Sequence, residues 1–300
     1  MSSALCIGNF DGVHRGHQLL IDALLSLSRE APIPLKTIAI NFNPHPKYFL
    51  NPDIKLTLLS SQKQKEQLLL KYGIDTVDTL DFNQNLSELT AEEFFHEYLL
   101  KRHDPKIIVI GNNFFFGKNK SGDSKLLKEL CLKNNILLHI QETLSLEGQI
   151  ISSSVIRGLI EKQGNVSKAT QLLGRNYSIS DIVKHGNKRG RTIGFPTANL
   201  YPGNNASYLI PKKGVYITIS SIGNSMHPSM TNVGFKPTVS KKNELVIESH
   251  LLNFDGDLYG KTMTVEFRDR IRDEITFSSI EQLKQQLQKD RVTAKRILGL

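Results

Sequence analysis

The sequence has no tryptophan and only two cysteines, Cys6 and Cys131, both inside apolar segments. Two such thiols do not make a disulfide framework, and they indicate buried cysteines in a reducing compartment, the cytoplasm. No apolar run reaches the roughly 20 residues that cross a bilayer, and the N-terminus lacks the regions of a signal peptide, so we expect no membrane partner. The sequence also lacks low-complexity tracts, which excludes a largely disordered chain.

What the sequence does contain is enough chain for two cores, because 300 residues exceed the usual size of one domain. The formal net charge of +9 is uneven. Residues 1–174 carry 19 basic and 18 acidic side chains, whereas residues 175–300 carry 19 basic and 11 acidic ones. The second part should therefore attract polyanions, either nucleotide phosphates or nucleic acid, and charge alone does not separate these two.

In residues 1–174, short apolar runs alternate with segments in which leucines recur every three or four positions. This alternation predicts βαβ units on a parallel sheet, a Rossmann-like α/β domain. Thr90 and Glu93 have the spacing of a capping box and mark the start of one helix. The expected strands are residues 4–8, 35–42, 76–82, 106–111 and 136–140.

In residues 175–300, strands follow one another with few helices between them and with Gly, Pro and Asn turns. This pattern predicts an antiparallel sheet or small β-barrel, with strands at 177–183, 214–222, 245–252 and 261–267. Ser279 and Gln282 begin a last amphipathic segment, so we expect a capped C-terminal helix over 279–298 on the outside. The change of pattern near Gly174 predicts two domains, residues 1–174 and 175–300.

The stretch GNFDGVHRGH, residues 8–17, lies where the first strand passes into a helix. Gly8 and Gly12 let the backbone turn tightly, and the helix that begins near Gly16 has unpaired N–H groups at its start. Those groups and the helix dipole favour an anion. His14 and His17 are three residues apart, so both imidazoles face the same side and are able to donate hydrogen bonds to phosphate.

Two other interpretations of this stretch stay open. The spacing of the histidine pair is also compatible with half of a metal site, for which only Asp11 is nearby as a further ligand. It is equally compatible with surface histidines in an ordinary turn. Further along, Ser152 to Ser154 precede VIRGLI and indicate a second helix start with hydroxyl donors, although simple N-capping explains them equally well. The guanidinium group of Arg157 is able to donate hydrogen bonds to two phosphate oxygens at once.

GNFDGVHRGH resembles the H-x-G-H motif of nucleotidylyltransferases. Its full sequence is similar to the motif in the adenylyltransferase module of the bacterial bifunctional riboflavin kinase/FMN adenylyltransferases, or FAD synthetases. The resemblance covers almost the whole chain, because NFNPHP, GNNFFFGKNKSGD, ISSSVIRGLI, GRTIGFPTANLYP, ESHLLNFDGDLYG and FRDRIRDEITFSS follow in the family's order. It implies an N-terminal nucleotidylyltransferase domain and a C-terminal riboflavin kinase barrel.

For the first half, the resemblance implies adenylylation of FMN by ATP with release of pyrophosphate. The residues implied in catalysis and ATP phosphate binding are Gly8, Asn9, Phe10, His14, Gly16, His17, Ser152, Ser153, Ser154 and Arg157, of which His14 and His17 are the catalytic ones. Asn43, His45 and Asn113 are the expected flavin contacts. Asn43 and Asn113 stand where the family commonly has acidic residues, which favours a role in binding over one in holding a metal ion.

For the second half, the resemblance implies a Mg²⁺ ion on the hard oxygen donors Thr197 and Asn199. ATP phosphates are expected at Gly186 and Arg191, in a loop where Asn187 replaces a common aspartate. Arg268 and Arg272 are expected near the flavin. Asp255 and Asp257 are predicted to be turn residues.

Glu248 lies in an otherwise apolar strand, where a carboxylate is costly to bury without a partner. The resemblance implies that it is the catalytic base that accepts the proton of the riboflavin hydroxyl. An outward-facing strand residue is the alternative. GNNFFFG has its own alternative, a strand end capped by aromatic packing.

The leading hypothesis is a bifunctional enzyme that phosphorylates riboflavin with ATP and Mg²⁺ and then adenylylates the FMN to FAD. Its expected partners are riboflavin, FMN, FAD and ATP, and no nucleic acid. The alternative hypothesis is a flavin-sensing or nucleic-acid-binding regulator, favoured by the charge of the second half and by Asn43, Asn113 and Asn187. Against it, the basic residues are not interleaved with aromatic side chains, and no nucleic-acid recognition motif is present.

Overall fold

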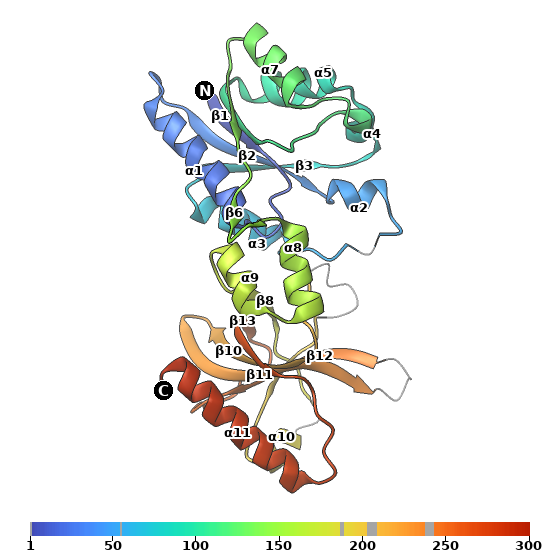
Figure 1. Cartoon of the computed structure of the whole chain (residues 1–300), viewed down its shortest axis with the longest axis vertical. Helices are drawn as coiled ribbons and strands as arrows, with labels where there is room; N and C mark the ends of the chain where they lie inside the picture. Colours follow the sequence, from blue (N-terminus) through green and yellow to red (C-terminus); the bar gives the residue numbers. More distant parts are fainter. Residues whose placement is uncertain (1, 55, 187–188, 203–208, 238–242) are drawn as a thin grey trace. The chain divides into compact units, whose positions relative to one another are not determined.

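A computed structural model describes residues 2–54, 56–186, 189–202, 209–237 and 243–300. By internal contacts the chain divides into two compact units, Met1–Ser153 and Ser154–Leu300, which are drawn in Figure 1. Three helical segments, α8 (Ser153–Arg157), η3 (Gly158–Gln163) and α9 (Val166–Leu173), lie ahead of residue 174. Because α9 packs on strands of the second unit, the contacts divide the chain earlier than the functional boundary at residue 174, which stays a prediction.

Five parallel strands form the sheet of the first unit, in the order β3-β2-β1-β4-β5. The strands are β1 (Ser3–Ile7), β2 (Lys36–Asn43), β3 (Thr76–Asp81), β4 (Pro105–Gly111) and β5 (Leu137–Gln141), followed by a hairpin of β6 (Ser145–Leu146) and β7 (Gln149–Ile150). This arrangement confirms the predicted Rossmann-like parallel α/β fold. The strand order reverses between β1 and β4, and such a switch point is where open α/β sheets bind ligands, beyond the carboxyl ends of the strands.

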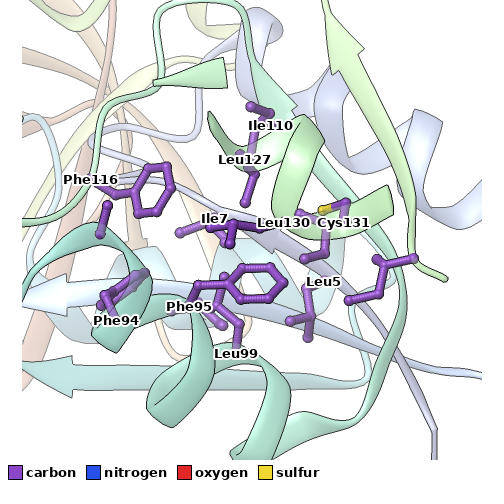
Figure 2. Packing of buried hydrophobic residues seen from close by; sticks show 14 of the residues in the cluster. Leu5, Ile7, Phe94, Phe95, Leu99, Ile110, Phe116, Leu127, Leu130 and Cys131 are labelled. Carbon is purple, nitrogen blue, oxygen red and sulfur yellow. The ribbon is translucent and has the colours of Figure 1, made fainter. Parts of the chain in front are cut away.

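Helices cover both faces of this sheet, which gives three layers (Figure 1). On one face, α1 (Arg15–Glu30) and α3 (Gln62–Lys71) share a core with Ala4 and Cys6 of β1. On the other, Leu5 and Ile7 pack with Phe95 and its neighbours, as Figure 2 shows. The second face is covered by α4 (Gln84–Glu88), α5 (Ala91–Phe94), the π-helix η1 (Phe95–Leu100) and α7 (Ser124–Lys133). Since side chains alternate along a strand, β1 is buried on both sides.

The predicted helix start at Thr90 is confirmed, because the Thr90 and Glu93 side chains form a complete capping box. From there α5, η1 and α6 (Lys101–His103) continue without a break, so the predicted single helix contains one π-helical stretch. The remaining short helices of the first unit are α2 (Pro46–Leu50) and the 3-10 turn η2 (Lys118–Lys120). Cys6 and Cys131 are free and buried, and burial raises the pKa of both thiols, which keeps them protonated.

Six antiparallel strands form the sheet of the second unit, in the order β8-β13-β10-β11-β12-β9. The strands are β8 (Tyr177–Ile182), β9 (Ala198–Leu200), β10 (Gly214–Ile222), β11 (Ser225–Pro237), β12 (Asn243–Leu251) and β13 (Thr262–Arg272), with a short helix α10 (Arg189–Thr192) before β9. A bridge between Lys184, just after β8, and Asn199 of β9 joins the two outer strands of that order. The antiparallel barrel-like fold predicted for this half is therefore confirmed.

The C-terminal helix α11 (Ile280–Leu298) begins at Ser279, whose hydroxyl accepts the N–H of Gln282, as the sequence predicts. Its residue Ala294 packs with Ile217 and Met230 on one face of the sheet. The other face of β10 to β12 carries five buried hydroxyls joined by hydrogen bonds of 2.6–2.8 Å: Thr218, Ser220, Ser229, Thr231 and Ser249. None of the helices in the described part of the chain is long and apolar enough to cross a membrane.

Candidate active sites

The loop between β1 and α1 leaves the sheet at its switch point. Gly8 still bonds to the sheet, donating its N–H to Ile40 O at 3.1 Å, and α1 begins after His14. Three residues in between have positive φ: Phe10 (48°), Gly12 (78°) and Val13 (39°). Glycine suits such a position, whereas Phe10 and Val13 are held there by burial of their side chains in the core beside α1.

The two histidines of this loop form a stacked pair. The rings of His14 and His17 lie 3.7 Å apart between centroids with a 13° tilt, and Phe10 meets His17 edge-on at 5.3 Å. A Cβ on Gly16 would lie 3.3 Å from the His14 ring, so glycine leaves room for the stack. Burial lowers the pKa of His17 well below its usual value, and the charges of His14 and Lys65 lower it further. His17 is therefore a neutral imidazole at pH 7, and its buried Nδ1 has no hydrogen-bond partner among the described residues.

Two other segments hold the loop in place. Asp11 accepts the N–H of Leu59 at 2.8 Å through Oδ1, and Gly12 donates its N–H to Ser60 Oγ at 3.2 Å. The hydroxyl of Ser153 donates a hydrogen bond to the Asp11 carbonyl at 3.0 Å. This bond connects the serine motif, residues 152–154, to the glycine-histidine loop, residues 8–17. Ser153 and the loop, which the resemblance assigns to the same ATP phosphates, are therefore in contact.

The start of α8 carries the rest of the serine motif. Ser152 precedes the helix and is partly buried, and Ser154 is exposed. Within the first turns, Arg157 Nη2 donates to Ser154 Oγ at 3.1 Å. Seryl hydroxyls at this helix start agree with the predicted second helix N-terminus.

The predicted flavin contacts of the first half lie at the carboxyl ends of β2 and β4, the edge of the sheet that β1 also leaves. Asn43 is exposed at the end of β2 and precedes a cis proline, and His45 caps α2 by accepting the Lys47 N–H at 3.1 Å. Asn113 is exposed in the turn after β4. Phe116 is buried in the core, so part of GNNFFFG serves packing, as the alternative interpretation holds.

One residue near the loop was not predicted. Lys65 of α3 is buried, donates to Asn41 Oδ1 at 3.3 Å, and interacts electrostatically with Asp11 and His17. The sequence gives only a capping-box spacing, Ser61 to Gln64, for the start of α3. Its contact with the glycine-histidine loop is tertiary and has no local pattern.

In the second unit, the segment before β9 is tightly folded around two glycines. A Cβ on Gly190 would overlap the Phe195 carbonyl oxygen, and one on Gly186 would lie 2.6 Å from Asn199 Nδ2. Asn199 is only 4% exposed and donates to the Thr197 carbonyl at 3.2 Å. The predicted phosphate-loop glycine and the predicted magnesium ligand are therefore in direct contact.

Glu248 is brought to the same place by the sheet. It pairs with Asn199 across β9 and β12, and with Asn232 across β11 and β12. Directly paired residues of an antiparallel sheet point to one face, so the three side chains are neighbours. Glu248 is partly buried, so it is not the freely exposed strand residue of the alternative interpretation. Asn232 was not predicted as a site residue.

The histidine after this carboxylate supports the same segment. Nδ1 of His250 is 2.8 Å from the Pro196 carbonyl, and its ring packs on Phe195 at 5.1 Å. Burial lowers the pKa of His250, the Pro196 bond raises it and Arg291 lowers it. A neutral His250 that donates to Pro196 holds the segment 195–197 against β12.

The three arginines of the last part of β13 have different surroundings. Arg268 is exposed, with Glu266 at 3.9 Å. Arg270 donates to Lys213 O and Asp273 at 2.6 Å. Arg272 is partly buried and makes an ion pair with the buried Asp290 of α11, with N–O distances of 3.1, 3.1 and 2.6 Å.

Of the other predicted residues, Arg191 is exposed in α10 and Asn9 is exposed in the first loop. Asp257 accepts the N–H of Tyr259 at 3.0 Å, which confirms it as a turn residue. Asn187 lies outside the described residues. Within the described residues, no group of three or more His, Cys, Asp or Glu side chains is placed to hold a metal ion.

Two family models match the chain. The FAD synthetase family matches residues 1–155, and the riboflavin kinase family, Flavokinase, matches residues 173–298. Curated relatives match almost end to end. Bifunctional riboflavin kinase/FMN adenylyltransferase of Escherichia coli K12 is 35% identical over 99% of this chain and 93% of its own length. The Buchnera aphidicola (Schizaphis graminum) protein of that name is 37% identical over 100% and 95%, and the Bacillus subtilis 168 protein is 34% identical over 98% and 92%.

A crystal structure described as a macrolide-efflux protein from Streptococcus pneumoniae has a TM-score of 0.88 to this chain. It is 34% identical and covers 98% of this chain and 94% of its own. That description applies to that protein. The family matches and the curated relatives agree with each other over both halves, and the chain belongs to the family of bifunctional riboflavin kinase/FMN adenylyltransferases.

Proposed function

We propose that the two activities are divided along the chain, with FMN adenylyl transfer in residues 1–174 and riboflavin phosphorylation in residues 175–300. The chain is a riboflavin kinase and FMN adenylyltransferase, and ATP is a substrate of both reactions. The separate family matches at 1–155 and 173–298 support this division. A cytoplasmic location belongs to the same proposal, supported by two free, buried thiols.

In adenylyl transfer, an oxygen of the FMN phosphate attacks the α-phosphorus of ATP. A new P–O bond forms as the bond to pyrophosphate breaks, so FAD and pyrophosphate leave. The nucleophile is already an anion, and the protein has to align two anions and stabilise the charge between them. We assign this work to the loop at the switch point and the serine motif that bonds to it, namely Gly8, Asn9, Phe10, His14, Gly16, His17, Ser152, Ser153, Ser154 and Arg157.

The stacked histidines act as hydrogen-bond donors in this assignment. A neutral His17 has one ring N–H, so it contributes one hydrogen-bond donor of fixed direction and no net charge. Arg157 supplies the full positive charge. Asn43, His45 and Asn113 are assigned to the flavin, supported by their position at the carboxyl ends of the strands next to β1.

In riboflavin phosphorylation, the terminal hydroxyl of riboflavin attacks the γ-phosphorus of ATP and loses its proton. A new P–O bond forms as the bond from the γ-phosphorus to ADP breaks, so FMN and ADP leave. We assign Glu248 as the base that accepts this proton. Thr197 and Asn199 would hold Mg²⁺, since their oxygens are of the type that this ion prefers and Asn199 is already fixed against Gly186. The ion supplies neutralisation of the transferring phosphoryl group when bound. Gly186 and Arg191 are assigned to the ATP phosphates, and Arg268 and Arg272 to the flavin.

The observation that carries the kinase assignment is the pairing of Glu248 with Asn199 across β9 and β12. The two residues are 49 positions apart in sequence, yet the sheet makes them direct neighbours. The Glu248 carboxylate is suited to accept a proton, and the Asn199 oxygen is suited to bind a cation. A base beside a metal ligand is the arrangement that phosphoryl transfer to an alcohol requires.

Purified protein with riboflavin, ATP and Mg²⁺ should yield FMN and then FAD on a chromatogram. Glu248→Gln should lower FMN formation by about 10²- to 10⁴-fold and leave the conversion of added FMN to FAD unchanged. His14→Asn should do the reverse. Asp257→Asn, which changes an exposed turn carboxylate, is the matched control. If both activities fell together in each folded variant, the division would be wrong.

A further inference from the structure

Lys65 is the only buried lysine or arginine among the described residues, with 4% of its surface exposed. An ammonium group is costly to bury unless a partner compensates it. Lys65 lies in α3, whose preceding residues Leu59 and Ser60 bond to the glycine-histidine loop. The buried cation is therefore close behind the loop assigned to ATP.

The hydrogen bond that Lys65 donates goes to a neutral amide, Asn41 Oδ1, at 3.3 Å. Asn41 is itself fully buried and is anchored by Thr79 at 3.0 Å and Gln62 at 3.1 Å. The network continues to Glu66, which accepts from Gln62 at 2.7 Å and Thr79 at 3.0 Å. The ammonium thus has a fixed place between β2, β3 and α3.

The charges of two carboxylates, Asp11 and Glu66, favour the ammonium form of Lys65. Asp11, 3% exposed, uses Oδ1 for the Leu59 N–H, and Glu66 bonds within the network just described. Burial lowers the pKa of Lys65, while Asp11 and then Glu66 raise it. In turn, the charge of Lys65 adds to burial and to His14 in lowering the pKa of His17.

We infer that Lys65 is a positioning residue for adenylyl transfer, whose buried ammonium stabilises the Asp11 carboxylate and the stacked His14–His17 pair behind the triphosphate. This inference rests on the proposed function of residues 1–174. Lys65 is too buried to reach a nucleotide, so it acts through its neighbours. Without it, the buried Asp11 carboxylate would lose a cation that compensates its charge, and His17 would lose one of the charges that keep it neutral.

Lys65→Met keeps the aliphatic stem and removes the charge. We expect its turnover number for FMN adenylylation to fall on the order of 10- to 100-fold, with a smaller change in the KM for ATP, because the loop geometry is disturbed. Riboflavin phosphorylation in the same sample should be unchanged. Lys63→Met, an exposed lysine of the same helix, is the matched control and should behave as wild type. Lys65→Arg, which keeps the charge, should recover part of the activity.

The pH profile separates this role from a merely structural one. In Lys65→Met the pKa of His17 should rise, so the acidic limb of FAD formation should move to higher pH. In Glu66→Gln, one of the charges that raise the pKa of Lys65 is gone, so the alkaline limb should move to lower pH. Glu66→Gln is almost isosteric, and its carbonyl oxygen is still able to accept from Gln62 and Thr79.

If wild type forms no FAD from FMN, the proposed function fails. If wild type forms FAD and Lys65→Met turns over equally fast, this inference alone fails. If calorimetry shows that the first unit of Lys65→Met does not fold, the pH profile of FAD formation by Glu66→Gln tests the inference instead. An alkaline limb that stays at the wild-type pH in folded Glu66→Gln would overturn the inference, and a limb at lower pH would support it.

Discussion

The ion pair between Arg272 and Asp290 joins β13 to α11, and breaking it should destabilise the second unit. The Asp290 side chain is 2% exposed and that of Arg272 is 16% exposed, and three N–O distances of 3.1 Å or less join them. Gln286 also donates to Asp290 at 2.8 Å. Asp290→Ala therefore leaves a largely buried guanidinium without its counter-charge.

Removing one partner of a buried ion pair costs about 3–5 kcal/mol. Because Arg272 keeps some contact with water, we take the lower end, about 3 kcal/mol. For a unit of about 150 residues this corresponds to a fall in Tm of about 6–12 °C. Arg272→Met should cost a similar amount, since it leaves the Asp290 carboxylate buried and unpaired.

Differential scanning calorimetry suits this test, because the chain has no tryptophan to report unfolding by fluorescence. In a cycle of Asp290→Ala, Arg272→Met and the double variant, the double variant should lose about 2 kcal/mol less than the two single losses together. Losses that add to within about 0.5 kcal/mol would refute a direct pair. If Arg272 served only the flavin, Arg272→Met would keep the wild-type Tm and raise the KM for riboflavin.

Two further predictions concern the site loops. The folded-state pKa of His17 lies below its unfolded value of about 6.5, so its contribution to stability is full above that pH and is lost as the pH falls below it. Below pH 6.5, the free energy of unfolding of wild type should fall by about 1 kcal/mol more per pH unit than that of His17→Gln, as measured by calorimetry. A difference in unfolding free energy between the two proteins that stays constant from pH 7.5 to 5 would refute this. Gly190→Ala should lower riboflavin phosphorylation by about tenfold or more, because its Cβ would overlap the Phe195 carbonyl oxygen, while FAD formation from FMN persists. Gly158→Ala, whose Cβ meets nothing within 4 Å, is the control, and equal kinase rates in both variants would contradict the steric argument.

Local patterns predicted the elements that position the sites. The passage from β1 to α1 was predictable because an apolar run, glycines and a leucine repeat follow one another within about 20 residues. β11 was missed because residues 225–237 show no regular alternation of apolar and polar side chains and include Pro228 and Gly234, which are unfavourable in strands. The two-residue turn Gly223–Asn224 between β10 and β11 is the hairpin indication that would have found it.

The roles of single charged residues were less predictable, because they depend on partners far away in sequence. The run FRDRIRDE has three arginines with the same local pattern, yet Arg272 pairs with Asp290 and Arg270 contacts Lys213 and Asp273. In the sequence, nothing distinguishes Lys65 from the other lysines of its polar segment. Its burial follows from the packing of α3 against β2 and β3. Glu248 was identified from the family resemblance, and its pairing with Asn199 follows from strand register, which a short strand such as β9 does not reveal in sequence.

Mixing two single-site variants tests most directly whether one chain carries two separate active sites. Glu248→Gln and His14→Asn should each, alone, form FAD from riboflavin, ATP and Mg²⁺ about 10²-fold or more slowly than wild type. Together they should form FAD faster than either alone, because FMN released by the His14→Asn protein reaches the adenylylation site of the other. A mixture of folded variants that forms FAD no faster than either variant alone, or either variant forming FAD from riboflavin at the wild-type rate, would contradict this account.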